Sequence, residues 1–133
     1  MSQASSATIL LVDDDPAVRD VTAAMLEDLG YGVIEADSGE MALDLLSKGV
    51  RIELMMADYS MPGMTGGELI EAVAVRRPGL PVLLVTGYAD ERTLASVGED
   101  CLVLKPFRTE DLGRKIRVAL GGPDSGQVVS LRR

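Results

Sequence analysis

The sequence lacks histidine altogether and holds one cysteine among its 133 residues. Without histidine, the chain cannot supply a Ser-His-Asp triad, a histidine metal ligand or a phosphohistidine of its own. The single Cys101 cannot form an internal disulfide, and its apolar neighbours predict a small core residue rather than a nucleophile. This cysteine usage fits a reducing cytoplasm, which is the compartment we expect.

Basic residues, aromatic residues and long apolar runs are scarce as well. Lys and Arg number 13 against 21 Asp and Glu, and the net charge of −8 argues against direct binding to nucleic acid or an anionic membrane. No apolar run approaches the roughly 20 residues of a membrane-spanning helix, and the polar start lacks the pattern of a signal peptide. The aromatic residues are Tyr31, Tyr59, Tyr88 and Phe107, so the core must be mainly aliphatic.

Short apolar runs alternate with helical patterns along the chain. Strands are expected at residues 8–12, 32–36, 52–57, 81–85 and 101–104. Helices are expected between the Asp15 cap and Gly30, from Ser38 to Gly49, around Leu69–Val73 before Pro78, at 90–97, and from a Thr109 cap to Gly121. Residues 59–66 are expected to form a loop. The chain thus divides into a disordered lead at 1–7, one domain at 8–121 and a flexible tail at 122–133.

Five strands alternating with five helices predict one doubly wound α/β domain with a parallel sheet. Right-handed crossovers leave few topologies, and the flavodoxin-like strand order 2-1-3-4-5 is the expected one. This order places the first, third and fourth strands side by side, with the fifth strand next to the fourth. The carboxyl ends of these four strands then converge on one pocket.

Polar residues stand at the ends of those four strands. Asp13 and Asp14 follow the first strand, Asp58 the third, Thr86 the fourth and Lys105 the fifth. Carboxylates suit Mg²⁺, and an aspartate can also form an acyl phosphate whose oxygens a lysine and a hydroxyl would stabilise. Each residue alone has a simpler explanation, such as a helix cap or a turn. Their occurrence in this order at four strand ends favours phosphoryl chemistry.

These motifs resemble those of the response-regulator receiver domain of two-component signal transduction, of the chemotaxis-receiver type. The resemblance covers roughly residues 7–121 and rests on four segments: 11–15 (LVDDD), 58–66 (DYSMPGMTG), 85–87 (VTG) and 105–107 (KPF). It implies that Asp58 is the phosphoacceptor. It also implies a Mg²⁺ site formed by Asp13, Asp14 and Asp58, with Asp14 the preferred direct ligand of the acidic pair and the Ser60 backbone carbonyl completing the shell.

The resemblance also implies how the phosphoryl group is held and read. Thr86 would bind it and move with it, Lys105 would pair with one of its oxygens, and Pro106 would follow a cis peptide bond, which the sequence alone merely permits. A histidine kinase or phosphotransfer protein would be the donor. An unknown downstream protein would bind the surface of the fourth helix, fifth strand and fifth helix, which could also form a homodimer.

Three positions are informative when the chain is compared with the family pattern. Leu102 stands where the family usually has an aromatic residue that rotates inward on activation, so the switch here is expected to use packing of Leu102 or motion of 87–97. Ser60 and Tyr88 occupy the two positions that commonly tune hydrolysis of the acyl phosphate. We hypothesise that Tyr88 shields the phosphoryl group from water.

Two other functions remain as alternatives. A receiver that binds partners without phosphorylation would fit the Leu102 departure. A haloacid-dehalogenase-type phosphatase would use Asp13 and Asp15, but it needs an acidic pair at a later strand end, and only Glu110 and Asp111, at a helix start, follow Lys105. No output domain is visible; the polar start favours a stand-alone receiver, while residues 121–126 could equally begin a linker.

Overall fold

The computed structural model describes residues 7–61, 63–87 and 102–121. In chain order their elements are β2 (Thr8–Val12), α1 (Pro16–Asp28), β3 (Gly32–Ala36), α2 (Gly39–Ser47), β4 (Leu54–Asp58), β5 (Ser60–Met61), β6 (Met64–Thr65), α3 (Gly66–Arg76), β7 (Val82–Thr86), β8 (Leu102–Leu104) and α5 (Thr109–Ala119). The expected helix at 90–97 and residue Cys101 lie outside the described residues. None of the helices described is long and apolar enough to cross a membrane.

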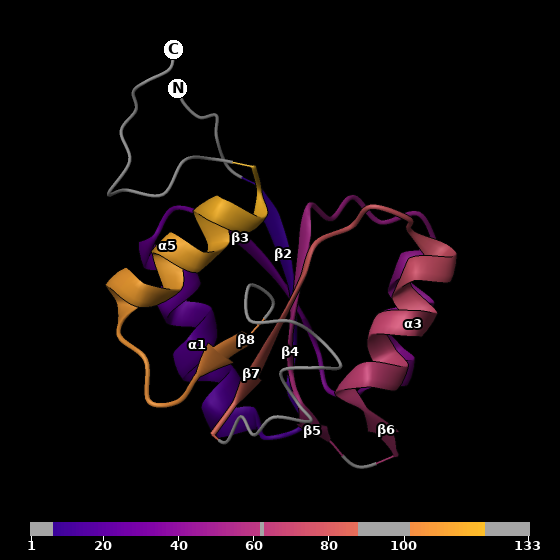
Figure 1. The fold of residues 1–133 in the computed structure, drawn as a ribbon, viewed down its shortest axis with the longest axis horizontal. Coiled ribbons are helices and arrows are strands. Elements are labelled where there is room, and N and C mark those ends of the chain that lie inside the picture. The colour runs from indigo at the N-terminus through magenta and orange to yellow at the C-terminus, as the bar shows by residue number, and fades with distance from the viewer. Residues whose placement is uncertain (1–6, 62, 88–101, 122–133) are drawn as a thin grey trace.

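The main sheet has five parallel strands in the order β3-β2-β4-β7-β8. Numbered by their place in the chain, these strands follow the predicted order 2-1-3-4-5, so the flavodoxin-like α/β fold is confirmed. Helices cover both faces of the sheet, with α1 and α5 on one side and α3 on the other (Figure 1). The order places β4 in the centre, between β2 and β7.

The sheet separates two hydrophobic cores, and alternate residues of each inner strand point to opposite cores. In β4, Met55 and Ala57 join the core under α2 and α3, while Leu54 and Met56 join the core under α1 and α5. All four are at most 1% exposed. Burial on both faces explains why this strand is a continuous apolar run up to Asp58.

Several helix starts follow the local sequence signals. The Asp15 carboxylate accepts hydrogen bonds from the backbone N–H groups of Ala17 and Val18, with Pro16 in the first turn as expected. The Ser38 hydroxyl caps α2 by accepting a hydrogen bond from the Met41 N–H at 3.1 Å. The first and second expected helices therefore begin where their caps predicted.

The expected Thr109 cap is wrong, because Thr109 is already the first residue of α5 and Arg108 holds the cap position. The carboxylate of Asp111 accepts the backbone N–H of Arg108 at 3.2 Å. An acidic side chain in the first turn thus satisfies the N–H of the cap residue, and the cap itself lies one residue earlier than the sequence predicts.

The expected loop at 59–66 contains ordered structure. Strands β5 and β6 pair as a short antiparallel hairpin, with Ser60 opposite Thr65. Thr65 then caps α3: its hydroxyl accepts the Glu68 N–H at 3.1 Å, and the Glu68 carboxylate accepts the Thr65 N–H at 2.9 Å. This reciprocal pair is a capping box, and it joins the hairpin after Asp58 directly to α3.

Glu53 connects the segment before β4 to the start of β2. Its contacts predict a pH-dependent contribution to stability. Its carboxylate accepts the backbone N–H of Thr8 at 2.6 Å and the Nε–H of Arg51 at 2.8 Å. The pKa of Glu53 lies below its ordinary value. The hydrogen bond from the Thr8 N–H is the main cause, and Arg51 is the second. A lowered folded-state pKa stabilises the protein above the unfolded-state pKa of about 4.3, and the gain is lost as pH falls through the folded-state pKa.

We therefore expect Glu53→Gln to lower the free energy of unfolding at pH 7, with a deficit that shrinks as pH falls below about 4. Urea unfolding of both proteins across this range measures the deficit. Glu71→Gln, on the exposed surface of α3, is the control for loss of one surface charge. A deficit that stays constant with pH would show that the Glu53 charge makes no contribution.

Candidate functional site

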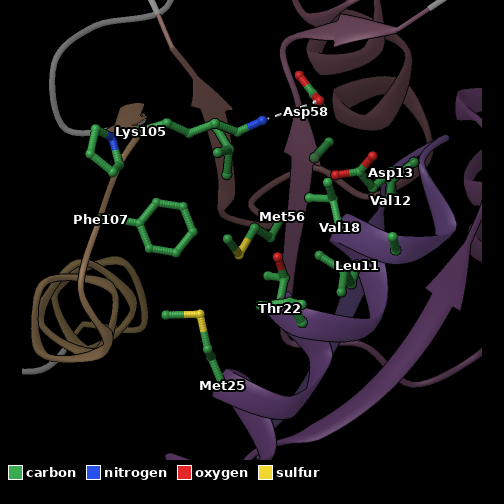
Figure 2. A pocket seen from close by; sticks show the side chains of 15 residues that line it. Leu11, Val12, Asp13, Val18, Thr22, Met25, Met56, Asp58, Lys105 and Phe107 are labelled. Atoms are coloured by element: carbon green, nitrogen blue, oxygen red, sulfur yellow. Dashed lines mark ion pairs between the residues drawn. The ribbon is translucent and has the colours of Figure 1, made fainter.

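The predicted polar residues converge at the carboxyl edge of the sheet. Asp13 directly follows β2, and Asp58 is the last residue of the neighbouring strand β4. Thr86 ends β7, on the other side of β4, and Lys105 directly follows β8. Figure 2 shows the Lys105 ammonium directed at Asp58, with Asp13 nearby. Parallel strands therefore bring together residues that are up to 92 positions apart (105 minus 13) in the sequence.

Three carboxylates form a compact cluster at this edge. One oxygen from each of Asp13, Asp14 and Asp58 lies within 4.8 Å of the others. Asp13 is buried, Asp58 is half-buried and Asp14 is exposed, so the cluster opens to solvent on the Asp14 side. An all-oxygen donor set with an open side is what Mg²⁺ binds, since it keeps several waters. The residues therefore fit the metal that the sequence implied.

Burial and neighbouring negative charge both act on the carboxylate of Asp13. Burial is the largest cause that raises the pKa of Asp13 above its ordinary value, and the negative charges of Asp58 and Asp14 raise it further. A hydrogen bond from the Asp15 N–H and the Lys105 ammonium act in the opposite direction without cancelling the rise. Such a strained arrangement of like charges favours a bound cation.

Lys105 places a cation opposite Asp58. Its Nζ lies 3.7 Å from Asp58 Oδ2, which is longer than the 2.7–2.9 Å typical of a charge-assisted hydrogen bond. The Lys105 backbone N–H donates to the Thr86 carbonyl at 2.8 Å, so the loop that carries the lysine is fixed to the end of β7. The peptide bond between Lys105 and Pro106 is cis, as the resemblance implied.

Three other positions that the sequence singled out are Ser60, Leu102 and Tyr88. Ser60 lies in β5, two residues beyond Asp58. Leu102 is 3% exposed, faces the core under α2 and α3, and pairs in register with Leu84 of β7. Tyr88 lies outside the described residues, so the shielding hypothesis stays a prediction.

A cavity of about 670 Å³ lies beside the acidic cluster, between α1 and the segment after β8. Asp58 and Lys105 line its upper end, and Met25, Met56 and Phe107 line its apolar floor (Figure 2). Asp58 and Lys105 thus adjoin an apolar recess on this side. Sequence reasoning did not predict this cavity, because its lining comes from five segments that are separate in the sequence.

Arg19 is a further residue that sequence reasoning missed. From the first turns of α1, its Nη1 donates to the backbone carbonyl of Asp13 at 2.7 Å and its Nε to Glu35 Oε1 at 3.0 Å. In the sequence, an arginine on an amphipathic helix looks like a surface residue exposed to solvent. No local pattern indicates which groups it contacts.

The fold and the site together define a class of protein. The family described as the response regulator receiver domain matches residues 9–117, which is most of the chain. The chain therefore belongs to the response regulator receiver domain family, whose members are phosphorylation-activated signalling switches rather than classical enzymes.

Individual relatives agree with this class. A chemotaxis protein CheY from Pseudomonas aeruginosa is 40% identical over 114 residues, which cover 81% of this chain and 91% of the relative. A cyclic di-GMP phosphodiesterase from Thermotoga maritima is 33% identical over 116 residues, and there the match covers 85% of this chain but only 31% of the relative. The solved structure of a CheY-like receiver domain protein from Methanospirillum hungatei JF-1 has a TM-score of 0.78 and 35% identity, covering 88% of this chain and 95% of that one.

Proposed function

We propose that this domain accepts a phosphoryl group on Asp58 in the presence of Mg²⁺, from a histidine kinase or a phosphotransfer protein, and thereby changes its binding surface. The observation that carries the proposal is the Asp58 carboxylate at the end of the central strand, clustered with two further carboxylates and 3.7 Å from the Lys105 ammonium. The residues to which the proposal assigns the roles of nucleophile, cation and metal ligands therefore lie together.

The transfer requires little from the protein beyond positioning and charge. An Asp58 oxygen attacks phosphorus while the bond from phosphorus to the donor nitrogen breaks, and the nitrogen keeps that electron pair. The product is an acyl phosphate on Asp58. Lys105 would stabilise one phosphoryl oxygen, and the Thr86 hydroxyl would donate a hydrogen bond to another.

The metal would be held by the carboxylates of Asp13, Asp14 and Asp58 and by the Ser60 carbonyl. When bound, Mg²⁺ supplies positive charge that neutralises the phosphoryl oxygens as they approach three carboxylates. The raised pKa of Asp13 supports this part of the proposal: burial is its main cause, and the negative charges of Asp58 and Asp14, which a cation would offset, add to it.

The response to phosphorylation would begin at Thr86. This residue is 6% exposed at the end of β7, so drawing its side chain toward Asp58 would shift the segment that follows it. The receiving surface would include β8 and α5, where Leu104 and Val118 are large apolar side chains left 54% and 42% exposed. A downstream protein or a second copy of the chain would bind there, in a reducing cytoplasm.

We expect incubation with acetyl phosphate and Mg²⁺ to add the mass of one phosphoryl group to the intact protein, and incubation without Mg²⁺ to add none. Three crowded carboxylates repel an incoming phosphate unless a cation is present. Intact-mass spectrometry and a free-phosphate assay on the same samples measure both the adduct and donor turnover. No adduct with the donor unchanged would instead indicate binding without phosphorylation.

Continuous hydrolysis of the donor without an adduct would indicate the phosphatase alternative. The structure disfavours that alternative, because Glu110 and Asp111 lie in the first turn of α5 rather than at a strand end. Asp111 is also engaged there by the Arg108 backbone N–H and the Arg114 side chain. A second acidic pair is therefore not available to the site from these residues.

A further inference from the structure

Arg19 links three parts of the fold beside the acidic cluster. Its guanidinium donates one hydrogen bond to the Asp13 carbonyl at 2.7 Å and another, from a different nitrogen, to the Glu35 carboxylate at 3.0 Å. The Arg19 side chain is 18% exposed and its Glu35 partner 42%. One side chain of α1 therefore connects the end of β2 to β3.

The contacts of Asp13 show what this link does. The Asp13 N–H donates to the Ala36 carbonyl at 3.1 Å, and Asp13 Oδ1 accepts the Asp15 N–H at 2.9 Å. Arg19 holds the third group, the carbonyl oxygen. That oxygen lies in the same planar peptide unit as the amide of Asp14. Fixing it therefore fixes the direction in which the chain enters Asp14.

We propose that Arg19 is a positioning residue that orients the Asp13–Asp14 peptide, so that both carboxylates face the metal site. The inference rests on the proposed function, because it assigns Arg19 to the same Mg²⁺ site. The two hydrogen bonds described for the Arg19 guanidinium go to the Asp13 carbonyl and to Glu35 rather than to a carboxylate of the acidic cluster. Arg19 acts through the backbone of the acidic pair, in the way that hydrogen-bond partners behind a metal ligand set its orientation.

The sign of one measurement separates this role from simple electrostatics. Arg19 is a positive charge beside a cation site, so a charge effect alone predicts that its removal tightens Mg²⁺ binding. Loss of orientation predicts the opposite, with affinity falling about tenfold or more, as for other groups behind metal ligands. The direction of the change therefore distinguishes the two explanations.

The experiment compares Mg²⁺ affinity by calorimetry in the wild type, Arg19→Ala, Arg19→Lys and Arg51→Ala. Arg51→Ala is the control for loss of an arginine paired with a glutamate: its Nε lies 2.8 Å from Glu53, as that of Arg19 pairs with Glu35, but Arg51 is more exposed and precedes β4, at the end of the sheet opposite the acidic cluster. We expect weaker binding in Arg19→Ala, an intermediate loss in Arg19→Lys, which keeps the charge but has a single donor group, and no change in Arg51→Ala.

A second readout needs no metal. Backbone amide NMR shifts of Asp14 and Asp15 should move in both Arg19 variants and stay fixed in Arg51→Ala. Unchanged or tighter Mg²⁺ binding by a folded Arg19→Ala would overturn the positioning role and leave the proposed function standing. If Arg19→Ala does not fold, Arg19→Lys decides by the same two measurements. Absence of Mg²⁺ binding by the wild type would instead overturn the proposed function and this inference with it.

Discussion

Asp58→Asn is expected to abolish phosphoryl transfer to the protein while leaving its fold intact. The side-chain amide is a poor nucleophile and does not form a stable acyl phosphate, whereas its size matches the carboxylate it replaces. Asp58 is the half-buried last residue of β4, beyond the fully buried positions, so an asparagine of the same size leaves the packing of the strand unchanged. Intact mass after incubation with acetyl phosphate and Mg²⁺ should show one phosphoryl group on the wild type and none on the variant.

The matched control is Asp44→Asn, which removes an equal charge from a surface pair of α2, where Asp44 Oδ2 lies 2.9 Å from Lys48 Nζ. Such exposed pairs contribute little to stability, so this variant should gain a phosphoryl group like the wild type. A gain by Asp58→Asn equal to that of the wild type would place the phosphoryl group on another carboxylate, with Asp13 and Asp14 the first to examine.

Gly66→Ala is expected to lower the free energy of unfolding by about 1–3 kcal/mol, the usual cost of overpacking a filled interior. Gly66 opens α3 where the helix meets the residue after Asp58. A Cβ at this position would lie 2.6 Å from Tyr59 Cδ1 and 3.1 Å from Leu84 Cδ1. Either the ring or the helix must move, and the Gly66 N–H that donates to the Tyr59 carbonyl at 3.1 Å would move with it.

Gly67→Ala provides the comparison within the same helical turn. A Cβ at Gly67 would meet nothing within 4 Å, and Gly67 has no positive φ, so alanine should fit and raise stability by up to about 1 kcal/mol. Urea unfolding of both variants measures the difference. If Gly66→Ala were as stable as Gly67→Ala, the contact between Tyr59 and the start of α3 would not be close-packed.

The strands and their order could be predicted because burial on both faces leaves a plain signal in the sequence. β2 and β4 are apolar at every position that lies between the helix layers, and each run ends at an aspartate. Once the strands are parallel, their ends must lie along one edge, which is how residues distant in the chain could be assigned to one site. Boundaries were less accurate: Ile52 was expected in a strand that begins at Leu54.

Features that depend on contacts between distant residues could not be predicted. The hairpin after Asp58 is too short for a periodic pattern, with only two residues in each strand. The link from Arg19 to the Asp13 carbonyl involves a backbone acceptor, and a backbone acceptor has no sequence signature. Asp111, rather than Thr109, serves the start of α5, because two residues with suitable side chains compete and local preference alone does not decide between them.

The placement of the reacting groups at strand ends also bears on how such a domain can diverge. Among the described residues, the outer faces of α3 and α5 carry exposed side chains such as Val75 and Val118 that take no part in holding the acidic cluster or Lys105. If α5 belongs to the receiving surface, as proposed, substitutions on its outer face would change the partner that is recognised at little cost to the phosphoryl site. The separation of the acidic edge from the helix surfaces would therefore let partner choice vary independently of the phosphoryl chemistry.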